Sequence, residues 1–108
     1  MRVVITIESH DQGWSSFPEH WGSYENSWTW FRAVLRRGEE CVGSWDICRN
    51  RHADEHWRKR TVVWEKPEDH PLMKELRAGD RIEIWPEARY PGWMNFVRYA
   101  SVEVLCWI

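Results

Sequence analysis

Cysteine is scarce in this sequence, and long apolar segments are missing. The three cysteines, Cys41, Cys48 and Cys106, are an odd number without metal-ligand spacing. We therefore expect neither a disulfide scaffold nor a zinc ribbon. A disulfide between Cys41 and Cys48 would form only if the protein were exported. The first residues, MRVVITIES, lack the apolar core of a secretory signal, and no later segment has the length of a membrane span. These absences predict a cytoplasmic protein with three free thiols and no membrane partner.

An excess of one charge is also missing, since 15 basic residues face 17 acidic ones and the net charge is −2. The whole chain therefore gives no reason to expect nucleic acid. A local basic run with aromatic neighbours resembles surfaces that hold single strands. It comprises Arg49, Arg51, Arg58, Lys59 and Arg60, near Trp45 and Trp57. Acidic residues at 54, 55 and 65–69 dilute its field, so we interpret it as a solvated charged surface and expect no nucleic-acid partner.

Tryptophan, in contrast, is abundant, with ten residues in a chain of 108. A small β domain can fill its core with a few very large side chains, because Trp is highly buried on average. Ten indoles are many for one small core, and each buried indole N–H needs a hydrogen-bond partner. We therefore expect several of them at the surface.

Alternation of apolar and polar residues predicts strands along most of the chain. We expect strands at 2–8, 27–37, 41–51, 57–66, 81–85 and 100–108, with a further extended stretch at 96–99. Only residues 72–77 have the length of a helical turn, opened by Pro71. This pattern predicts one all-β domain over residues 1–108. It would be an antiparallel β-sandwich, jelly-roll-like, with long aromatic loops and at most one short helical turn.

The expected core follows from the same alternation. Its predicted members are Val3, Ile5, Ile7, Phe31, Ala33, Leu35, Ile82, Ile84, Val102 and Val104. Residues 100–108 are apolar on both faces, which predicts a central position for that strand in its sheet. We assign four further indoles to the structure of the sheets: Trp28, Trp30, Trp64 and Trp107.

Two loops, at 9–26 and 88–95, carry large aromatic side chains where sheet packing does not require them. Loops of an antiparallel sandwich cluster at its two ends, so we expect these loops to meet and form a ligand surface. Trp14 and Trp93 lie at this surface in our interpretation, since Gly, Ser and Pro neighbours make turns that lift a side chain off the sheet. The predicted ligand residues are Asp11, Gln12, Trp14, Trp21, Tyr24, Arg49, His52, Tyr90, Trp93 and Asn95. The alternative is that the same indoles anchor the loops to the body.

Catalysis and metal binding have weaker support. Cys48 with His52 or His56 would make a nucleophile pair, but a cysteine in the middle of a strand is better explained as a small core residue. Glu8, Asp11 and Glu25 would suit calcium, although their spacing is generic. We therefore expect no enzyme, no cofactor and no metal. The preferred function is a lectin-like module for a carbohydrate or small polar ligand, and the alternative is a protein-interaction or self-assembling module, a possible homo-oligomer, with Trp and Arg at its interface.

Several segments resemble a Trp-rich β-sandwich domain found in many fungal proteins. They are DQGWSS at 11–16, SWTWF at 27–31, RHA at 51–53, LRAGDRIEI at 76–84 and YPGWMNFVRYASVEV at 90–104. The likeness runs along the length of the chain. It implies a β-sandwich and a fungal context, and it brings no catalytic residues with it.

Overall fold

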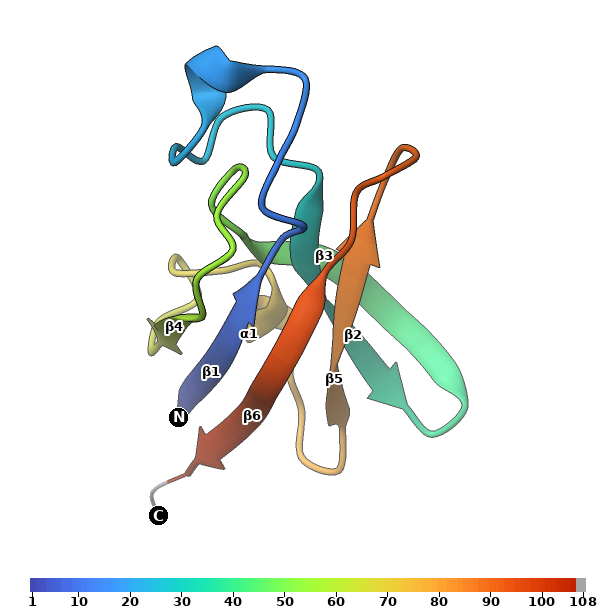
Figure 1. Ribbon diagram of the computed structural model, residues 1–108. Helices are drawn as coiled ribbons and strands as arrows, with labels where there is room; N and C mark the ends of the chain where they lie inside the picture. Colours follow the sequence, from blue (N-terminus) through green and yellow to red (C-terminus); the bar gives the residue numbers. More distant parts are fainter. Residues whose placement is uncertain (107–108) are drawn as a thin grey trace.

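Six strands form two antiparallel three-stranded sheets in the computed structural model, which describes residues 1–106 (Figure 1). About half of the residues lie in strands, so the all-β prediction is confirmed. One sheet has the strand order β4-β1-β6 and the other β3-β2-β5. The elements are β1 (Arg2–His10), a 3₁₀ turn η1 (Pro18–His20), β2 (Thr29–Arg37), β3 (Glu40–Arg49), β4 (Arg58–Trp64), the single-turn helix α1 (Leu72–Glu75), β5 (Arg81–Ala88) and β6 (Phe96–Leu105).

The core joins the central strands of the two sheets. Val3, Ile5 and Ile7 of β1 are at most 2% exposed, as the period-two pattern predicts. Phe31 and Ala33 of β2 belong to the same buried cluster, together with residues of β4 and α1. Burial of each large aliphatic side chain stabilises the fold by about 1.5–3 kcal/mol. Both β1 and β2 have hydrogen-bonded neighbours on either side, which explains why their inward residues are the most completely covered.

The prediction that the last strand is central is wrong. The strand order places β6 at the edge of its sheet, with β1 as its one partner. Val104, predicted in the core, is 45% exposed, because it lines an open groove between β5 and β6. Ile82, Ile84 and Val102 pack against the core but are only half-buried. Trp107 and Ile108 lie outside the described residues.

Three loops gather at one end of the molecule, and the N-terminus and the end of β6 lie at the other (Figure 1). The three loops span residues 11–28, 50–57 and 89–95, and they connect β1 to β2, β3 to β4 and β5 to β6. Since the paired strands are antiparallel, the β1–β2, β3–β4 and β5–β6 connections all leave from the same end. Within residues 1–106, none of the helices has the length and apolar character needed to cross a bilayer.

Candidate functional site

A buried carboxylate organises the loop end. Asp11 is 0% exposed. Its oxygens accept hydrogen bonds from the backbone N–H groups of Gly13 at 2.8 Å, Ala53 at 2.6 Å and Asp54 at 3.0 Å. Burial raises the pKa of Asp11, while these hydrogen bonds oppose that rise. The side chain ties the first loop to the second, so it is occupied by the fold.

His52, in the second loop, also holds the loops together through contacts with the first loop. Its ring is fully buried, and Nδ1 lies 2.9 Å from the carbonyl oxygen of Glu25. A carbonyl only accepts, so Nδ1 carries the proton and Nε2 accepts from the hydroxyl of Ser15. The Ser15 oxygen also accepts from the backbone N–H of Phe17 at 3.1 Å and the indole of Trp21 at 2.9 Å. This Ser–His contact therefore serves as a loop clasp, with both partners already engaged.

Two amide side chains complete the framework. Gln12 donates to a neighbouring backbone carbonyl and accepts from the backbone N–H of Met94 at 3.1 Å, which links the first loop to the third. Asn95 donates to backbone carbonyls of β2 and β5 at 3.0 and 3.2 Å and accepts from Asn50 at 2.9 Å. Asp11, Gln12, His52 and Asn95 thus position the loops, and we leave them out of the ligand-contacting set.

An aromatic pocket of about 350 Å³ opens between the first and third loops. The indole of Trp28 and the ring of Tyr90 form one wall, edge to face, with centroids 5.0 Å apart. Trp93 stands edge-on to the buried His52 ring at 5.1 Å, which fixes its orientation. The lining residues of this aromatic pocket are Phe17, Asn26, Trp28, Tyr90 and Trp93.

A second hollow of about 220 Å³, the middle pocket, shares Asn26 and Trp28 with the first. The guanidinium of Arg49 lies 5.6 Å from the ring centre of Trp28 and 5.5 Å from that of Trp30. Such cation–π contacts hold a long side chain in place. The middle pocket is lined by Tyr24, Asn26, Ser27, Trp28 and Arg49.

The predicted ligand residues thus divide into three groups. Tyr24, Arg49, Tyr90 and Trp93 line the two pockets. Asp11, Gln12, His52 and Asn95 hold the loops together. Trp14 and Trp21 are 57% and 50% exposed but line neither pocket.

Trp14 covers the turn of the third loop. Gly92 has φ +86°, and a Cβ there would come within 3.2 Å of the Trp14 ring. This glycine therefore permits both the left-handed turn and the close approach of the indole. Trp14 packs on the outside of the loop whose other residues face the pocket.

Four residues that line the two pockets were missed by the sequence pattern: Phe17, Asn26, Ser27 and Trp28. Trp28 was assigned to the sheets, but β2 begins at Thr29, so Trp28 is the last residue of the loop. Asn26 has φ +53°, and its side-chain oxygen accepts from the Trp28 indole at 2.9 Å. An Asn two residues before a Trp at a strand start was the available signal, since Asn is enriched in the left-handed region.

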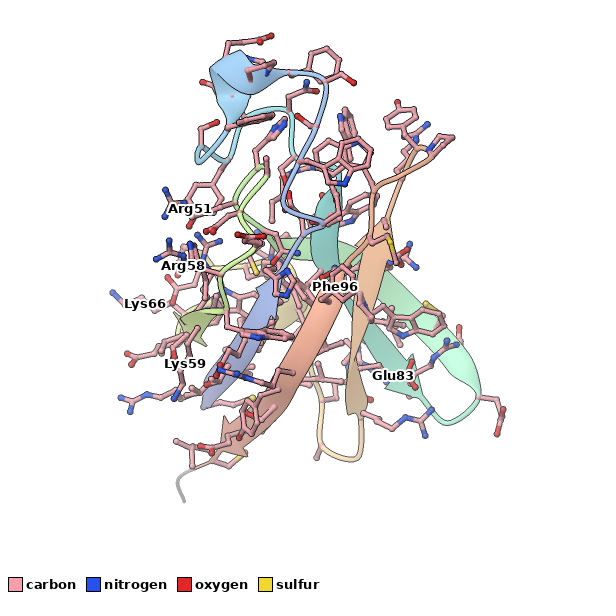
Figure 2. All side chains as sticks on the ribbon, viewed as in Figure 1. Arg51, Arg58, Lys59, Lys66, Glu83 and Phe96 are labelled. Atoms are coloured by element: carbon pink, nitrogen blue, oxygen red, sulfur yellow. The ribbon has the colours of Figure 1, made fainter. Side chains whose placement is uncertain are left out.

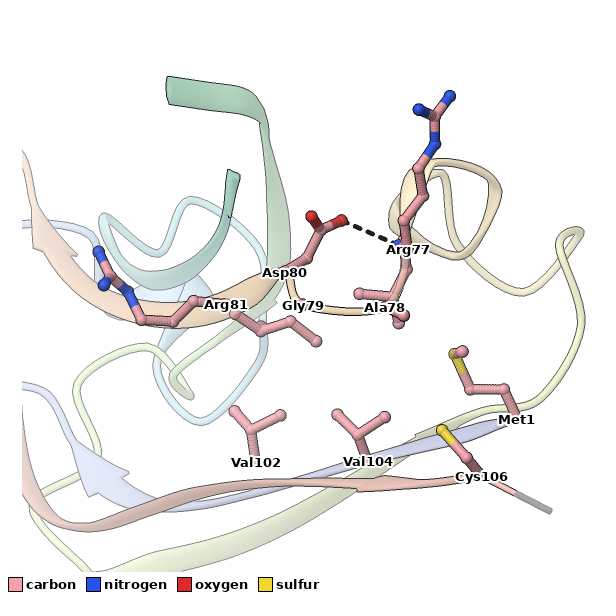
Figure 3. A pocket seen from close by; sticks show the side chains of 11 residues that line it. Met1, Arg77, Ala78, Gly79, Asp80, Arg81, Val102, Val104 and Cys106 are labelled. Atoms are coloured by element: carbon pink, nitrogen blue, oxygen red, sulfur yellow. Dashed lines mark hydrogen bonds between the residues drawn. The ribbon is translucent and has the colours of Figure 1, made fainter. Parts of the chain in front are cut away.

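A larger groove of about 370 Å³ lies between β5 and β6, at the end of the molecule opposite the three loops (Figure 3). Val102 and Val104 point from β6 toward the turn at 77–81. The carboxylate of Asp80 in its lining accepts hydrogen bonds from the backbone N–H of Arg77 at 2.9 Å and from the Arg37 guanidinium at 2.9 Å. Within residues 1–106, the lining of the groove is mainly aliphatic and contains no aromatic side chain, so this part of the chain suits a sugar poorly.

Metal and thiol chemistry find little support. Within the stretch of chain that the structure describes, no three His, Cys, Asp or Glu side chains gather closely enough to hold a metal ion. Glu8, one of the predicted calcium ligands, is paired with Arg98 instead. Burial raises the pKa of the Cys48 thiol, with Arg60 opposing, which lowers the fraction of reactive thiolate.

Comparisons of the chain with protein-family models, with curated proteins and with solved structures find no match. The geometry of the loop end is therefore the ground on which a function is argued.

Proposed function

We propose that the protein is a non-enzymatic, lectin-like module that binds a carbohydrate or similar small polar ligand at the aromatic and middle pockets. The observation that carries this proposal is the row of aromatic faces at Trp28, Tyr90 and Trp93, open to solvent at the loop end. A sugar ring packs its C–H face on an aromatic ring while its hydroxyls make hydrogen bonds.

Polar groups stand free beside these rings. Among residues 1–106, the hydroxyls of Tyr24 and Tyr90 have no hydrogen-bond partner, and neither does the amide nitrogen of Asn26. A polar ligand needs such groups, because its hydroxyls lose their hydrogen bonds to water on binding and an apolar pocket alone provides no replacement. The pockets therefore combine stacking surface with unused donors and acceptors.

The backbone of Tyr90 supports a role for its side chain. Its φ is +74°, a left-handed conformation that bulky side chains rarely adopt. Strain of this kind persists where the surroundings over-determine it and clusters at ligand sites. Tyr90 is 53% exposed, so burial of its ring does not explain the strain.

The finer fold assignment belongs to the same proposal. A core cluster drawn from both sheets supports two layers of one jelly-roll-like β-sandwich, the architecture that the likeness to the fungal Trp-rich domain implies. Loops that meet at one end of such a domain are a common place for ligand sites. A cytoplasmic location also belongs to this proposal.

A glycan array followed by tryptophan fluorescence titration tests the proposal. We expect a bound saccharide to change the fluorescence of the wild-type protein and of a Trp85→Ala control, since Trp85 lies on β5 outside both pockets. Trp28→Ala should bind the same saccharide at least about tenfold more weakly. If no glycan binds the wild-type protein, the proposal is wrong.

The alternative, a self-assembling module, is favoured by a different surface. β6 is an edge strand with several large exposed apolar side chains, and such edges pair readily with other chains. The exposed apolar residues of β6 are Phe96, Val97, Tyr99, Val104 and Leu105. A large species on a sizing column, unaffected by saccharide and reduced to monomer by Val97→Lys, would favour this alternative over the lectin.

A further inference from the structure

We infer that the ligand is an acidic saccharide, whose carboxylate or sulfate lies among four arginine side chains next to the middle pocket. This inference rests on the proposed function, because it concerns the next hollow in the same row. Tyr24 and Arg49 line both that hollow and the middle pocket. The lining of this arginine hollow includes Tyr24, Arg49, Arg51, Arg58 and Arg60.

The positive charge of this hollow is only partly balanced. Asp54 is its neighbouring carboxylate, 2.8 Å from Nε of Arg58 and 3.9 Å from Nε of Arg51. Among residues 1–106, no carboxylate lies within 4.0 Å of the guanidinium of Arg49 or Arg60. Four cations therefore converge near one anion, which leaves an electrostatic gain for an added negative group.

The two unbalanced arginines are held in place by aromatic rings and carbonyls. Arg60 lies 4.6 Å from the ring centre of Tyr24, and one of its N–H groups donates to the carbonyl of Arg49 at 3.4 Å. Arg49 lies against the rings of Trp28 and Trp30. Each guanidinium retains further N–H donors in a planar fork that matches a carboxylate or sulfate. Preorganised cations lose less side-chain freedom when an anion binds.

The sizes of the two hollows indicate which part of an acidic sugar each would hold. The arginine hollow offers about 20 Å³, room for an oxygen or two of an anionic group but not for a sugar ring. The adjoining middle pocket offers about 220 Å³. An acidic sugar fits this arrangement with its ring in the middle pocket and its charged substituent reaching between Tyr24 and Arg49.

A single-stranded nucleic acid is the competing class of ligand. Figure 2 shows Arg51, Arg58, Lys59 and Lys66 along the side of the molecule where β4 lies. Beyond Lys59 this side turns mixed in charge, because acidic residues follow at positions 65, 68 and 69. A strand of phosphates needs a continuous positive track, whereas the excess charge here is confined to one hollow. The observations therefore favour one acidic group on a sugar.

Matched pairs of saccharides test the charge directly. Isothermal titration would compare trigalacturonate with its neutral methyl ester, and galactose 6-sulfate with neutral galactose. We expect one acidic member to bind at least about tenfold more tightly than its matched partner, with a preference that falls as sodium chloride is added. Arg60→Gln should abolish the preference, and Arg60→Lys should retain some of it.

Arg81→Gln is the matched control, because it removes one positive charge from the exposed side of β5, away from the hollow. It should leave the preference unchanged. Arg49→Gln provides a second variant if Arg60→Gln fails to fold. Its loss of preference would support the inference equally.

The outcomes separate the two proposals. Equal binding of the acidic and neutral members, unaffected by Arg60→Gln, would overturn the inference and leave the lectin proposal standing. Failure of every array glycan and every tested saccharide, neutral or acidic, would overturn both. A decathymidylate that binds more tightly than every acidic saccharide would replace the inference with nucleic-acid binding.

Discussion

The indole of Trp28 and the phenol ring of Tyr90 meet edge to face, with 5.0 Å between centroids and 90° between planes. One residue ends the first loop and the other belongs to the third, so the contact joins segments that are distant in sequence. Aromatic pairs in this geometry contribute about 0.5–1.5 kcal/mol beyond their burial. The pair also forms a wall of the aromatic pocket, which connects the packing of the loops with the proposed binding of a ligand.

Truncation of Tyr90 should affect binding more than stability. We expect Tyr90→Ala to weaken saccharide binding by about 1–3 kcal/mol, with base stacking as the nearest measured analogue, while Tm changes by a few degrees. Tyr90 is 53% exposed, so little burial is lost. Titration calorimetry and thermal unfolding measure the two effects. Trp14→Ala serves as the control outside the pocket, and a loss of binding in that variant alone would move the site away from Tyr90.

Core and edge substitutions should differ sharply. Ile5 is 0% exposed, so Ile5→Ala should reduce the free energy of unfolding by about 2–5 kcal/mol. Val104 is 45% exposed, and Val104→Ala should cost no more than about 0.5 kcal/mol. Urea unfolding followed by fluorescence measures both. Similar losses for the two variants would mean that β6 is packed as a core strand after all.

The sequence pattern predicted the central strands well and the edges poorly. Val3, Ile5, Phe31 and Leu35 lie on the aliphatic faces that the period-two pattern assigns to the core, and the structure buries each of them. Val104 alternates just as clearly and is exposed, because periodicity reports which face a residue is on and not what lies opposite that face. Strand order is set by long-range pairing, which a local pattern does not contain.

Loss of the Asp11 carboxylate should loosen the loop end. Asp11→Asn replaces one accepting oxygen with a donor, so at least one of the three backbone N–H groups that it binds loses its partner. We expect a loss of about 1–3 kcal/mol in the free energy of unfolding. Hydrogen exchange at Ala53 and Asp54 should become faster than in the wild type. Unchanged exchange at these two amides would contradict the role given to Asp11.

Acid should remove the stabilising effect of Asp80. The Arg37 side chain, through its hydrogen bonds, holds the pKa of the Asp80 carboxyl below its ordinary value of 3.8. Because the folded pKa is lower than the unfolded one, ionised Asp80 stabilises the fold above that value, and the effect is lost as pH falls through the folded pKa. Asp80→Asn should therefore lower Tm at pH 7, and its difference from wild type should shrink below pH 3.8. A difference that stays constant with pH would argue against this ion pair.

The thiols should react at different rates. All three cysteines are unpaired, with Cys41 and Cys106 exposed and Cys48 half-buried. A thiol reagent should modify Cys41 and Cys106 quickly in the native protein and Cys48 slowly, since burial raises the pKa of Cys48. Thiol titration in denaturant without reductant should detect all three thiols. Recovery of only one thiol would indicate a disulfide and reopen the question of export.

The loop site shows where reasoning from residue types fails. Asp11, His52 and Asn95 looked like ligand groups because they are polar and lie in loops. Long packed loops contain buried backbone N–H and carbonyl groups, and short polar side chains are the residues that satisfy them. Aromatic residues with turn-forming neighbours were a better guide, as Tyr90 and Trp93 line the pocket. Trp14 has the same kind of neighbours, yet it packs on Gly92 outside the pocket.

Indole resonances in a ¹H–¹⁵N spectrum provide the most direct test that the loop-end pockets bind a saccharide. Each Trp contributes one Nε1–H signal, so the ten indoles report separately on the core, the sheet surfaces and the loops. Addition of the saccharide identified by the array should shift the signals of Trp28 and Trp93, which line the aromatic pocket, and leave those of Trp64 and Trp85 in place. Shifts confined to Trp57 or Trp85, or no shift at saturating saccharide, would contradict the assignment of the site to these pockets.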